Sequence, residues 1–343
     1  MTSQVESRDT VISFPALDGR EINLIHVEGP RAATKGPVML VHGAGVRADI
    51  FRPPSQTTLV DLLVGEGHDV WLLNWRASID LPPNEWTLDQ AAAFDHPAAV
   101  RRVLAETGAE TMQAIVHCQG STSFVMSAVA GLVPEVTTIV SNAVSLHPKI
   151  RPFSELKIHW VAPLIARFTP YLNPGWGDTA EAPFEKAIAR LVRLTHHECD
   201  NDVCKGVSFT YGTGFPCLWS HENLSDETHE WLRKEFAECP LSFFAQMSEC
   251  VRRGHLVSMS HLSRLPRDYT AGPPRTDARF AFFAGEDNLC FLPESQERSY
   301  DFFDTHRPGQ HALHVVPGYG HLDMFMGKNA DGDVFPQIME ELG

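Results

Sequence analysis

The segment that decides the fold reads Ala114-Ile115-Val116-His117-Cys118-Gln119-Gly120-Ser121. An apolar run typical of a buried strand leads into Cys118, and apolar side chains at helical spacing follow between positions 124 and 129. A strand, a sharp turn, a nucleophile and a helix in this order form a nucleophile elbow. Gly120 lets the turn close tightly, whereas Val116 stands where the common pattern Gly-x-Ser-x-Gly has its first glycine. The segment therefore predicts a turn that presents Cys118 at the start of a helix.

Cys118 has a physical reason to be reactive at this position. The free N–H groups and the positive dipole end of a helix N-terminus stabilise a thiolate, and a nearby histidine lowers the pKa of a thiol further. A buried free cysteine is, however, often only a small apolar side chain. Taken alone, the segment leaves a nucleophilic and a structural Cys118 equally open.

Short apolar runs on both sides of this segment predict the strands of one sheet. The predicted strands are 38–41, 70–73, 114–116, 137–140, 279–284 and 312–316. Between the second and third of them, an alanine-rich stretch over 88–107 predicts a helix that ends at Gly108, and a last helix is predicted over 334–342. Strands that alternate with helices predict right-handed βαβ units and a mostly parallel α/β sheet.

The middle of the chain differs in texture from the rest. Residues 149–270 are rich in aromatic residues, Pro and Arg, show no strand alternation, and predict helices such as 184–195 and 226–237, the latter capped by Ser225. We expect residues 149–270 to form a helical cap insertion, and residues 1–148 and 271–343 to form the two parts of the core.

The cap carries many aromatic side chains, which favour an apolar acyl or alcohol group as ligand. They are Trp160, Trp176, Trp219, Trp231, Phe153, Phe168, Phe184, Phe243 and Phe244. The alternative is that they form the core of the cap and its seam with the sheet.

Two further loops supply candidate partners for Cys118. Asp287 follows the predicted strand 279–284, and His321 follows the predicted strand 312–316. Because the carboxyl ends of parallel strands converge on one edge of the sheet, we expect these side chains to meet there. The chain order of Cys118, Asp287 and His321 is then nucleophile, acid and base, which predicts a catalytic triad.

An oxyanion hole is predicted beside this triad. The strand that ends at Val41 continues as His42-Gly43-Ala44-Gly45. A backbone N–H from this loop, together with the N–H of the residue after the nucleophile, would bind an oxyanion, and we assign Ala44 and Gln119. Supporting residues of the loop and the elbow are His42, Gly43, Gly120 and His117.

Composition limits the classes of partner. Lys and Arg number 28 against 43 Asp and Glu, a net charge of −15, which argues against nucleic acid or an anionic membrane. No apolar stretch is long enough to span a bilayer, and the polar N-terminus does not resemble a signal peptide, so we expect a cytoplasmic protein without stable membrane insertion. The cysteine count of 7 is odd, so at least one thiol is free of an intrachain disulfide.

These motifs resemble the α/β-hydrolase family along nearly the whole chain, and more narrowly its acid-lipase branch. The stretches that match that branch are 69–76, 94–100 with 107–108, and 117–121. The chain is most similar to bacterial α/β-hydrolase domains associated with cholesterol-oxidase-like flavoenzymes, through the Cys118 elbow and the stretches 288–295, 317–323 and 327–330. Val116 departs from the small residue that the family has at that position.

The resemblance implies an α/β-hydrolase fold, with a mostly parallel central sheet flanked by helices and a helical cap insertion. It implies acyl transfer to water, in which Cys118 attacks an ester, lactone or thioester of an apolar substrate, His321 carries the proton and Asp287 orients His321.

Two other functions remain open from the sequence: acyl transfer from a thioester, as in polyester synthases, and a non-catalytic partner of a flavoenzyme. A functional link to a flavin oxidoreductase is implied by the resemblance alone, and the sequence leaves open whether the chain forms a homodimer.

The sequence carries no Gly-x-Gly-x-x-Gly fingerprint after a strand, so we expect no cofactor.

One other cluster contains metal-ligating residue types. His196-His197-Glu198-Cys199 with Cys204 could bind zinc, or Cys199 and Cys204 could pair. The Cys-x4-Cys spacing is at the loose end for zinc and no second pair follows nearby, so we expect no metal. A reducing cytoplasm opposes the disulfide, and whether the two cysteines pair stays open.

Overall fold

The apolar runs form a parallel array of strands in the computed structural model, which describes residues 7–55 and 57–343. These strands are β3 (Pro37–Val41), β4 (Asp69–Asn74), β5 (Met112–His117), β6 (Val136–Asn142), β9 (Arg279–Gly285) and β10 (Ala312–Val316). β3 is buried along its whole length, as expected for a strand covered on both faces by helices. All six predicted strands and the α/β class are confirmed.

The sheet has eight strands in the order β1-β2-β4-β3-β5-β6-β9-β10. β1 (Arg8–Pro15) and β2 (Glu21–Glu28) form an antiparallel hairpin, and β2 pairs antiparallel with β4. The sequence analysis missed β1 because it is an edge strand whose residues are mostly exposed, so it lacks an apolar run. It also missed β2, although β2 carries apolar, buried side chains between β1 and β4. Residues 1–6, part of the N-terminus from which we expected no signal peptide, lie outside the described residues.

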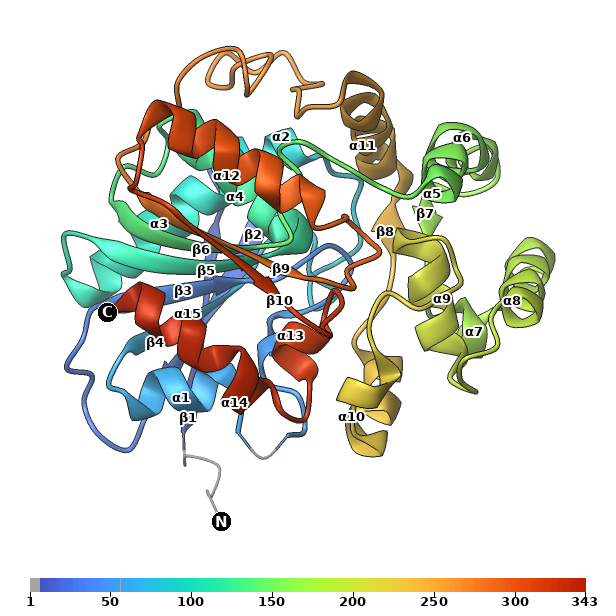
Figure 1. Cartoon of the computed structure of the whole chain (residues 1–343), viewed down its shortest axis with the longest axis horizontal. Coiled ribbons are helices and arrows are strands. Elements are labelled where there is room, and N and C mark those ends of the chain that lie inside the picture. Colours follow the sequence, from blue (N-terminus) through green and yellow to red (C-terminus); the bar gives the residue numbers. More distant parts are fainter. Residues whose placement is uncertain (1–6, 56) are drawn as a thin grey trace.

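Helices cover both faces of the sheet (Figure 1). The covering elements are η1 (Ala48–Phe51), α1 (Leu59–Gly65), α2 (Leu88–Gln90), α3 (His96–Thr107), α4 (Cys118–Val129), α12 (Glu294–His306), α13 (Asp323–Met326), α14 (Ala330–Asp333) and α15 (Phe335–Leu342). The helix predicted over 88–107 is continuous through a π-helical turn, η2 (Ala91–Asp95), and ends at Gly108 with φ 70°. The last predicted helix corresponds to α15.

The chain between β6 and β9 packs beside the sheet as a mostly helical layer (Figure 1). Its elements are α5 (Pro152–Leu156), η3 (Lys157–Val161), α6 (Ala162–Ile165), β7 (Tyr171–Leu172), α7 (Trp176–Thr179), α8 (Pro183–Thr195), α9 (Asp202–Tyr211), η4 (His221–Asn223), α10 (Asp226–Trp231), η5 (Leu232–Lys234), β8 (Cys239–Pro240) and α11 (Leu241–Arg253). We call this layer the cap; its expected bounds, 149–270, stay a prediction.

Two predicted cap helices form as expected at their N-terminal ends. α8 begins at Pro183, and the Ser225 hydroxyl accepts a hydrogen bond from the backbone N–H of Thr228 at the start of α10. The predicted 226–237 helix is shorter, because α10 tightens into η5, which ends at Lys234. The cap strands β7 and β8 pair antiparallel and were not predicted, because each is only two residues long.

Candidate active site

Cys118 stands in a sharp turn between β5 and α4, with φ 55°. A non-glycine residue in this region of backbone conformation is strained, and such strain is typical of functional turns. A Cβ on Gly120 would collide with the carbonyl oxygen of His42, so only glycine lets α4 lie this close to the loop after β3. The elbow therefore has the predicted form, and Val116 is accommodated inside β5, fully buried.

His321 meets Cys118 at the carboxyl edge of the sheet. The Cys118 sulfur and ring nitrogens of His321 and His117 all lie within 4.8 Å of one another, and all three residues are buried. The backbone N–H of His321 donates a hydrogen bond of 2.8 Å to the Leu218 carbonyl in the cap. The cap thus helps to hold the loop that carries His321.

The third position of the predicted triad needs a correction. Nδ1 of His321 lies 3.2 Å from Oδ1 of Asn288, while the side chain of Asp287 is exposed to solvent. Asn288 is buried, and its Oδ1 also accepts the backbone N–H of Cys290. The sequence analysis chose the right loop but the wrong residue in it, because it preferred a carboxylate to the adjacent amide.

Cys290 is a second thiol at the site, to which the sequence analysis gave no role. The pKa of Cys118 lies well below its usual value, first because the Cys290 thiol lies beside it and then because of His321, and these effects outweigh burial. The same contact raises the pKa of Cys290. Of the two thiols, Cys118 is therefore the one that ionises more readily.

The two predicted oxyanion donors line the rim of the elbow. Ala44 and Gln119 are both buried, and Gln119 lies in the first turn of α4, where backbone N–H groups have no partner inside the helix. The carbonyl of Ala44 accepts a 2.9 Å hydrogen bond from the Tyr211 hydroxyl, and Trp75 Nε1 donates to the His42 carbonyl at 2.9 Å. These bonds hold the loop after β3 in place.

The two supporting histidines are neutral at physiological pH. Burial lowers the pKa of His42 to about 3 and that of His117 to about 4. Nδ1 of His117 lies 2.7 Å from Oδ1 of Asn142, and Nδ1 of His42 lies 2.7 Å from the Gly43 carbonyl. Each histidine therefore donates to a fixed oxygen and shapes the site without adding charge to it.

Two cavities meet at the elbow. A cavity of about 310 Å³ is lined by Cys118, His321 and Ala44. A larger one, of about 670 Å³, is lined by Gln119, Cys290 and mostly apolar cap side chains, and Tyr211 borders both. An apolar group of a bound molecule can therefore lie in the cap while its reactive carbon lies beside Cys118.

The cap aromatics divide between the expected roles. Phe243 and Phe244 are buried and line the larger cavity, as a substrate pocket requires. Trp176 and Trp219 are buried within the cap core. Trp160 and Phe168, by contrast, are 72% and 69% exposed, so neither interpretation accounts for them.

The chain as a whole is similar in sequence to human Lipase member K, at 32% identity over 337 residues, 90% of this chain and 80% of that protein. The chain belongs to the lipase family of α/β-hydrolases. Triacylglycerol lipase 1 of Arabidopsis thaliana is 21% identical to it over 335 residues, 91% of this chain and 81% of that lipase. Membership of the lipase family supports an enzyme of the esterase and lipase type of hydrolases.

A third relative matches only in part. Sterol esterase 2 of Saccharomyces cerevisiae is 26% identical over 157 residues, which are 38% of this chain and 29% of that protein. No family model matches the chain. These relatives do not bear on the link to a flavin oxidoreductase, on a homodimer or on a cytoplasmic location, which stay predictions.

Solved structures share the fold. An esterase from Thermogutta terrifontis superposes with a TM-score of 0.57 at 18% identity, covering 98% of each chain. A lipase in its open form superposes with a TM-score of 0.61 at 14% identity, again over 98% of each chain. These likenesses confirm the predicted α/β-hydrolase fold. Among the described residues, no helix has the length and apolar character needed to cross a bilayer.

Proposed function

We propose that this protein hydrolyses a carboxylic ester, lactone or thioester of an apolar substrate through a covalent acyl-enzyme on Cys118. The observation that carries the proposal is the meeting of a strained Cys118, His321 and Asn288 at the carboxyl edge of the sheet. The relatives named above are two lipases and a sterol esterase, and these names support an ester as the substrate.

In the first half of the reaction, the Cys118 sulfur attacks the acyl carbon, and the thiol proton passes to His321. The carbonyl oxygen becomes an oxyanion that accepts hydrogen bonds from the N–H groups of Ala44 and Gln119. The bond between the acyl carbon and the alcohol oxygen or thiol sulfur then breaks, and His321 returns the proton to this leaving group.

In the second half, His321 takes a proton from water, whose oxygen attacks the acyl carbon bound to Cys118. The carbon–sulfur bond breaks, the acid leaves, and the Cys118 sulfur recovers the proton from His321. Asn288 holds the His321 ring through Nδ1, so that the other ring nitrogen faces the sulfur and the leaving group. The low pKa of Cys118 favours attack at neutral pH.

The large cavity supports an apolar acyl or alcohol group. Its side chains from η3, α6 and α11 are mostly apolar, and Gln119 and Cys290 connect it to the elbow. We expect turnover of p-nitrophenyl esters to rise from acetate to octanoate, because longer chains bury more apolar surface in this cavity. A preference for acetate would contradict the assignment of the cavity.

The nucleophile is tested with a pair of cysteine variants. We expect Cys118→Ala to lower turnover by about 10³-fold or more, and Cys250→Ala, which removes a buried thiol in α11, to stay within about 2-fold of wild type. Intact-mass spectrometry of the wild type during turnover should show an added acyl group that is absent from Cys118→Ala. Equal activity in wild type and Cys118→Ala excludes Cys118 as the nucleophile.

The same assay separates the two other functions left open by the sequence. With an aliphatic alcohol added, a hydrolase releases mainly free acid, whereas an acyltransferase releases mainly the new ester. A non-catalytic partner of a flavoenzyme would show neither product nor an acyl-enzyme.

A further inference from the structure

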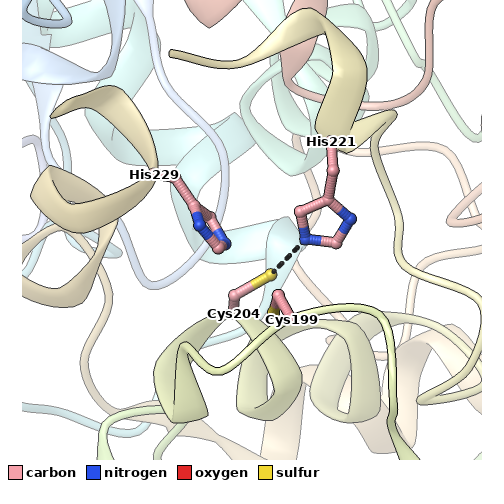
Figure 2. A group of neighbouring side chains, drawn as sticks. All are labelled: Cys199, Cys204, His221 and His229. Carbon is pink, nitrogen blue, oxygen red and sulfur yellow. Dashed lines mark hydrogen bonds between the residues drawn. The ribbon is translucent and has the colours of Figure 1, made fainter. Parts of the chain in front are cut away.

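A second cluster of sulfur and nitrogen ligands lies in the cap, apart from the Cys118 site. Cys199 precedes α9, Cys204 lies in its first turn, His221 begins η4, and His229 lies in α10. Figure 2 shows the two histidine rings facing the two thiols across a small gap. Three segments that are separate in the sequence thus bring their metal-ligating atoms to one point.

The distances suit tetrahedral coordination. The two sulfurs and one ring nitrogen from each histidine all lie within 4.8 Å of one another, and Cys204 Sγ lies 3.4 Å from His221 Nε2. Zinc bonds of about 2.3 Å to sulfur and 2.0–2.1 Å to nitrogen give tetrahedral edges of about 3.6 Å. The four atoms therefore need only small side-chain rotations to surround one ion.

The His221 ring is oriented as a metal ligand would be. Its Nδ1 lies 3.3 Å from a carboxylate oxygen of Glu198, and its Nε2 points at the Cys204 sulfur. A carboxylate that accepts the proton on one ring nitrogen leaves the other nitrogen with a free lone pair, which is the usual arrangement around zinc-bound histidines. The backbone N–H of Cys217 also donates to Glu198 and holds the carboxylate.

His229 supplies an independent indication. Its Nε2 is buried and has no hydrogen-bond partner, a costly state for a polar atom unless a ligand binds it. The Asn201 side chain holds both sides of the cluster: Nδ2 donates to the His229 carbonyl at 2.5 Å, and Oδ1 accepts the Cys204 N–H at 3.0 Å. Asn201 thus links the segment that carries Cys204 to the helix that carries His229 without using any of the four ligand atoms.

We propose that Cys199, Cys204, His221 and His229 bind one zinc ion as a closed structural Cys2His2 site in the cap. Both thiols lose their protons to solvent on binding, so the two thiolates balance the charge of Zn²⁺. Sulfur and imidazole ligands select zinc over calcium or magnesium, which prefer oxygen. This proposal replaces the expectation of no metal, which rested on the loose Cys-x4-Cys spacing and the lack of a second pair nearby, and did not include His221 or His229.

The zinc site fastens the cap to the loop that carries His321. Residues 217–223, which include the ligand His221, also contact the loop that carries His321. The His321 N–H donates to the Leu218 carbonyl, and the Asn223 amide donates to the buried Asp323 carboxylate at 2.7 Å. Asp323 also accepts the Gly320 N–H, at 2.9 Å. Loss of zinc is therefore expected to loosen this segment as well as the cap.

Metal analysis of the wild-type chain tests the proposal without any variant. We expect about one zinc per purified chain, and the cobalt-substituted protein to show the intense visible absorption of tetrahedral Co²⁺ with thiolate ligands. Absence of zinc, together with no uptake of added Zn²⁺ or Co²⁺ by the reduced protein, overturns it. So does a disulfide between Cys204 and Cys217, whose sulfurs lie 3.6 Å apart, in freshly purified protein.

Variants separate this site from the elbow, where Cys118, His117 and His321 also cluster. We expect Cys204→Ala to lose bound zinc and His229→Ala to weaken it by about 10-fold or more, while Cys118→Ala keeps about one zinc per chain. Zinc lost from Cys118→Ala but kept by His229→Ala would assign the metal to the elbow and overturn the proposal. Because metal content is the readout, the result does not depend on the proposed hydrolase function.

Discussion

At the scale of the residue, Asn288 sets this site apart from the triad expected from the sequence. An amide oxygen can hold the Nδ1 proton of His321 and fix its tautomer, as a carboxylate does. Unlike an ionised carboxylate, the amide places no negative charge beside the ring. A thiol nucleophile needs less help, because its pKa is much lower than that of a serine hydroxyl. The neighbouring Cys290 and His321 lower the pKa of Cys118 further.

The assignment of Asn288 is tested by two neighbouring alanine variants. We expect Asn288→Ala to lower kcat/KM by roughly 10- to 100-fold, because the His321 ring loses its orienting partner. Asp287→Ala should stay within about 2-fold, because that side chain is exposed to solvent. Steady-state kinetics on one p-nitrophenyl ester measure both, and a larger loss in Asp287→Ala would restore the carboxylate as the orienting group.

At the scale of the element, the contact between β3, β5 and α4 decides whether Cys118 is presented correctly. The strand β5 delivers the chain into the elbow, and α4 can start there only if its first turn passes close to the His42 carbonyl. Gly120 allows this approach, and the proposed oxyanion donors Gln119 and Ala44 lie in the two segments that it brings together. The second glycine of the common pattern is therefore required here, while the first is replaced by Val116 without loss of the fold.

A glycine pair tests this contact. We expect Gly120→Ala to lower the free energy of unfolding by about 1–3 kcal/mol and to reduce turnover, because the added methyl group must displace the loop after β3. Gly65→Ala, at the end of α1 where a Cβ meets nothing within 4 Å, should be neutral or stabilising by up to about 1 kcal/mol. Urea unfolding measures both, and equal stabilities for the two variants would show that the elbow has room for a side chain.

At the scale of the whole molecule, the core encloses histidines that must stay neutral for the chain to fold. His96 packs in the layer between η2 and α4, where Nε2 lies 2.7 Å from the Ser123 hydroxyl and burial lowers its pKa to about 3. His42 and His117 are buried in the same way near the elbow. The unfolded chain protonates all three near their ordinary pKa of about 6.5, while the folded chain does not.

Acid should therefore unfold the protein at a higher pH than protonation of its carboxylates alone would. Between pH 6.5 and about 3 the unfolded state binds more protons at these histidines, so the free energy of unfolding falls as the pH falls. We expect His96→Gln to reduce this slope by up to about 1.4 kcal/mol per pH unit, because one such group is removed. Urea unfolding at pH 7 and pH 5 gives the slope, and an unchanged slope in the variant would contradict a neutral buried His96.

The strands of the parallel array and the sharp turn at Cys118 were predictable because each depends on local pattern. Apolar runs form buried strands wherever they occur, and a small residue two places after Cys118 is a steric requirement of the turn itself. The short cap strands and the edge strand β1 carried no such pattern and were missed.

By itself, therefore, the sequence determined the fold class, the sharp turn at Cys118 and the loop that contacts His321. Only the tertiary structure decided that Asn288, not Asp287, faces His321. The backbone conformation of the loop sets the direction of each side chain, so two neighbouring residues can point to different sides. Only the tertiary structure, too, joined His221 and His229 to Cys199 and Cys204, because the ligands come from segments whose meeting depends on how the cap helices pack. Local periodicity specifies elements; long-range packing specifies which side chains share a point in space.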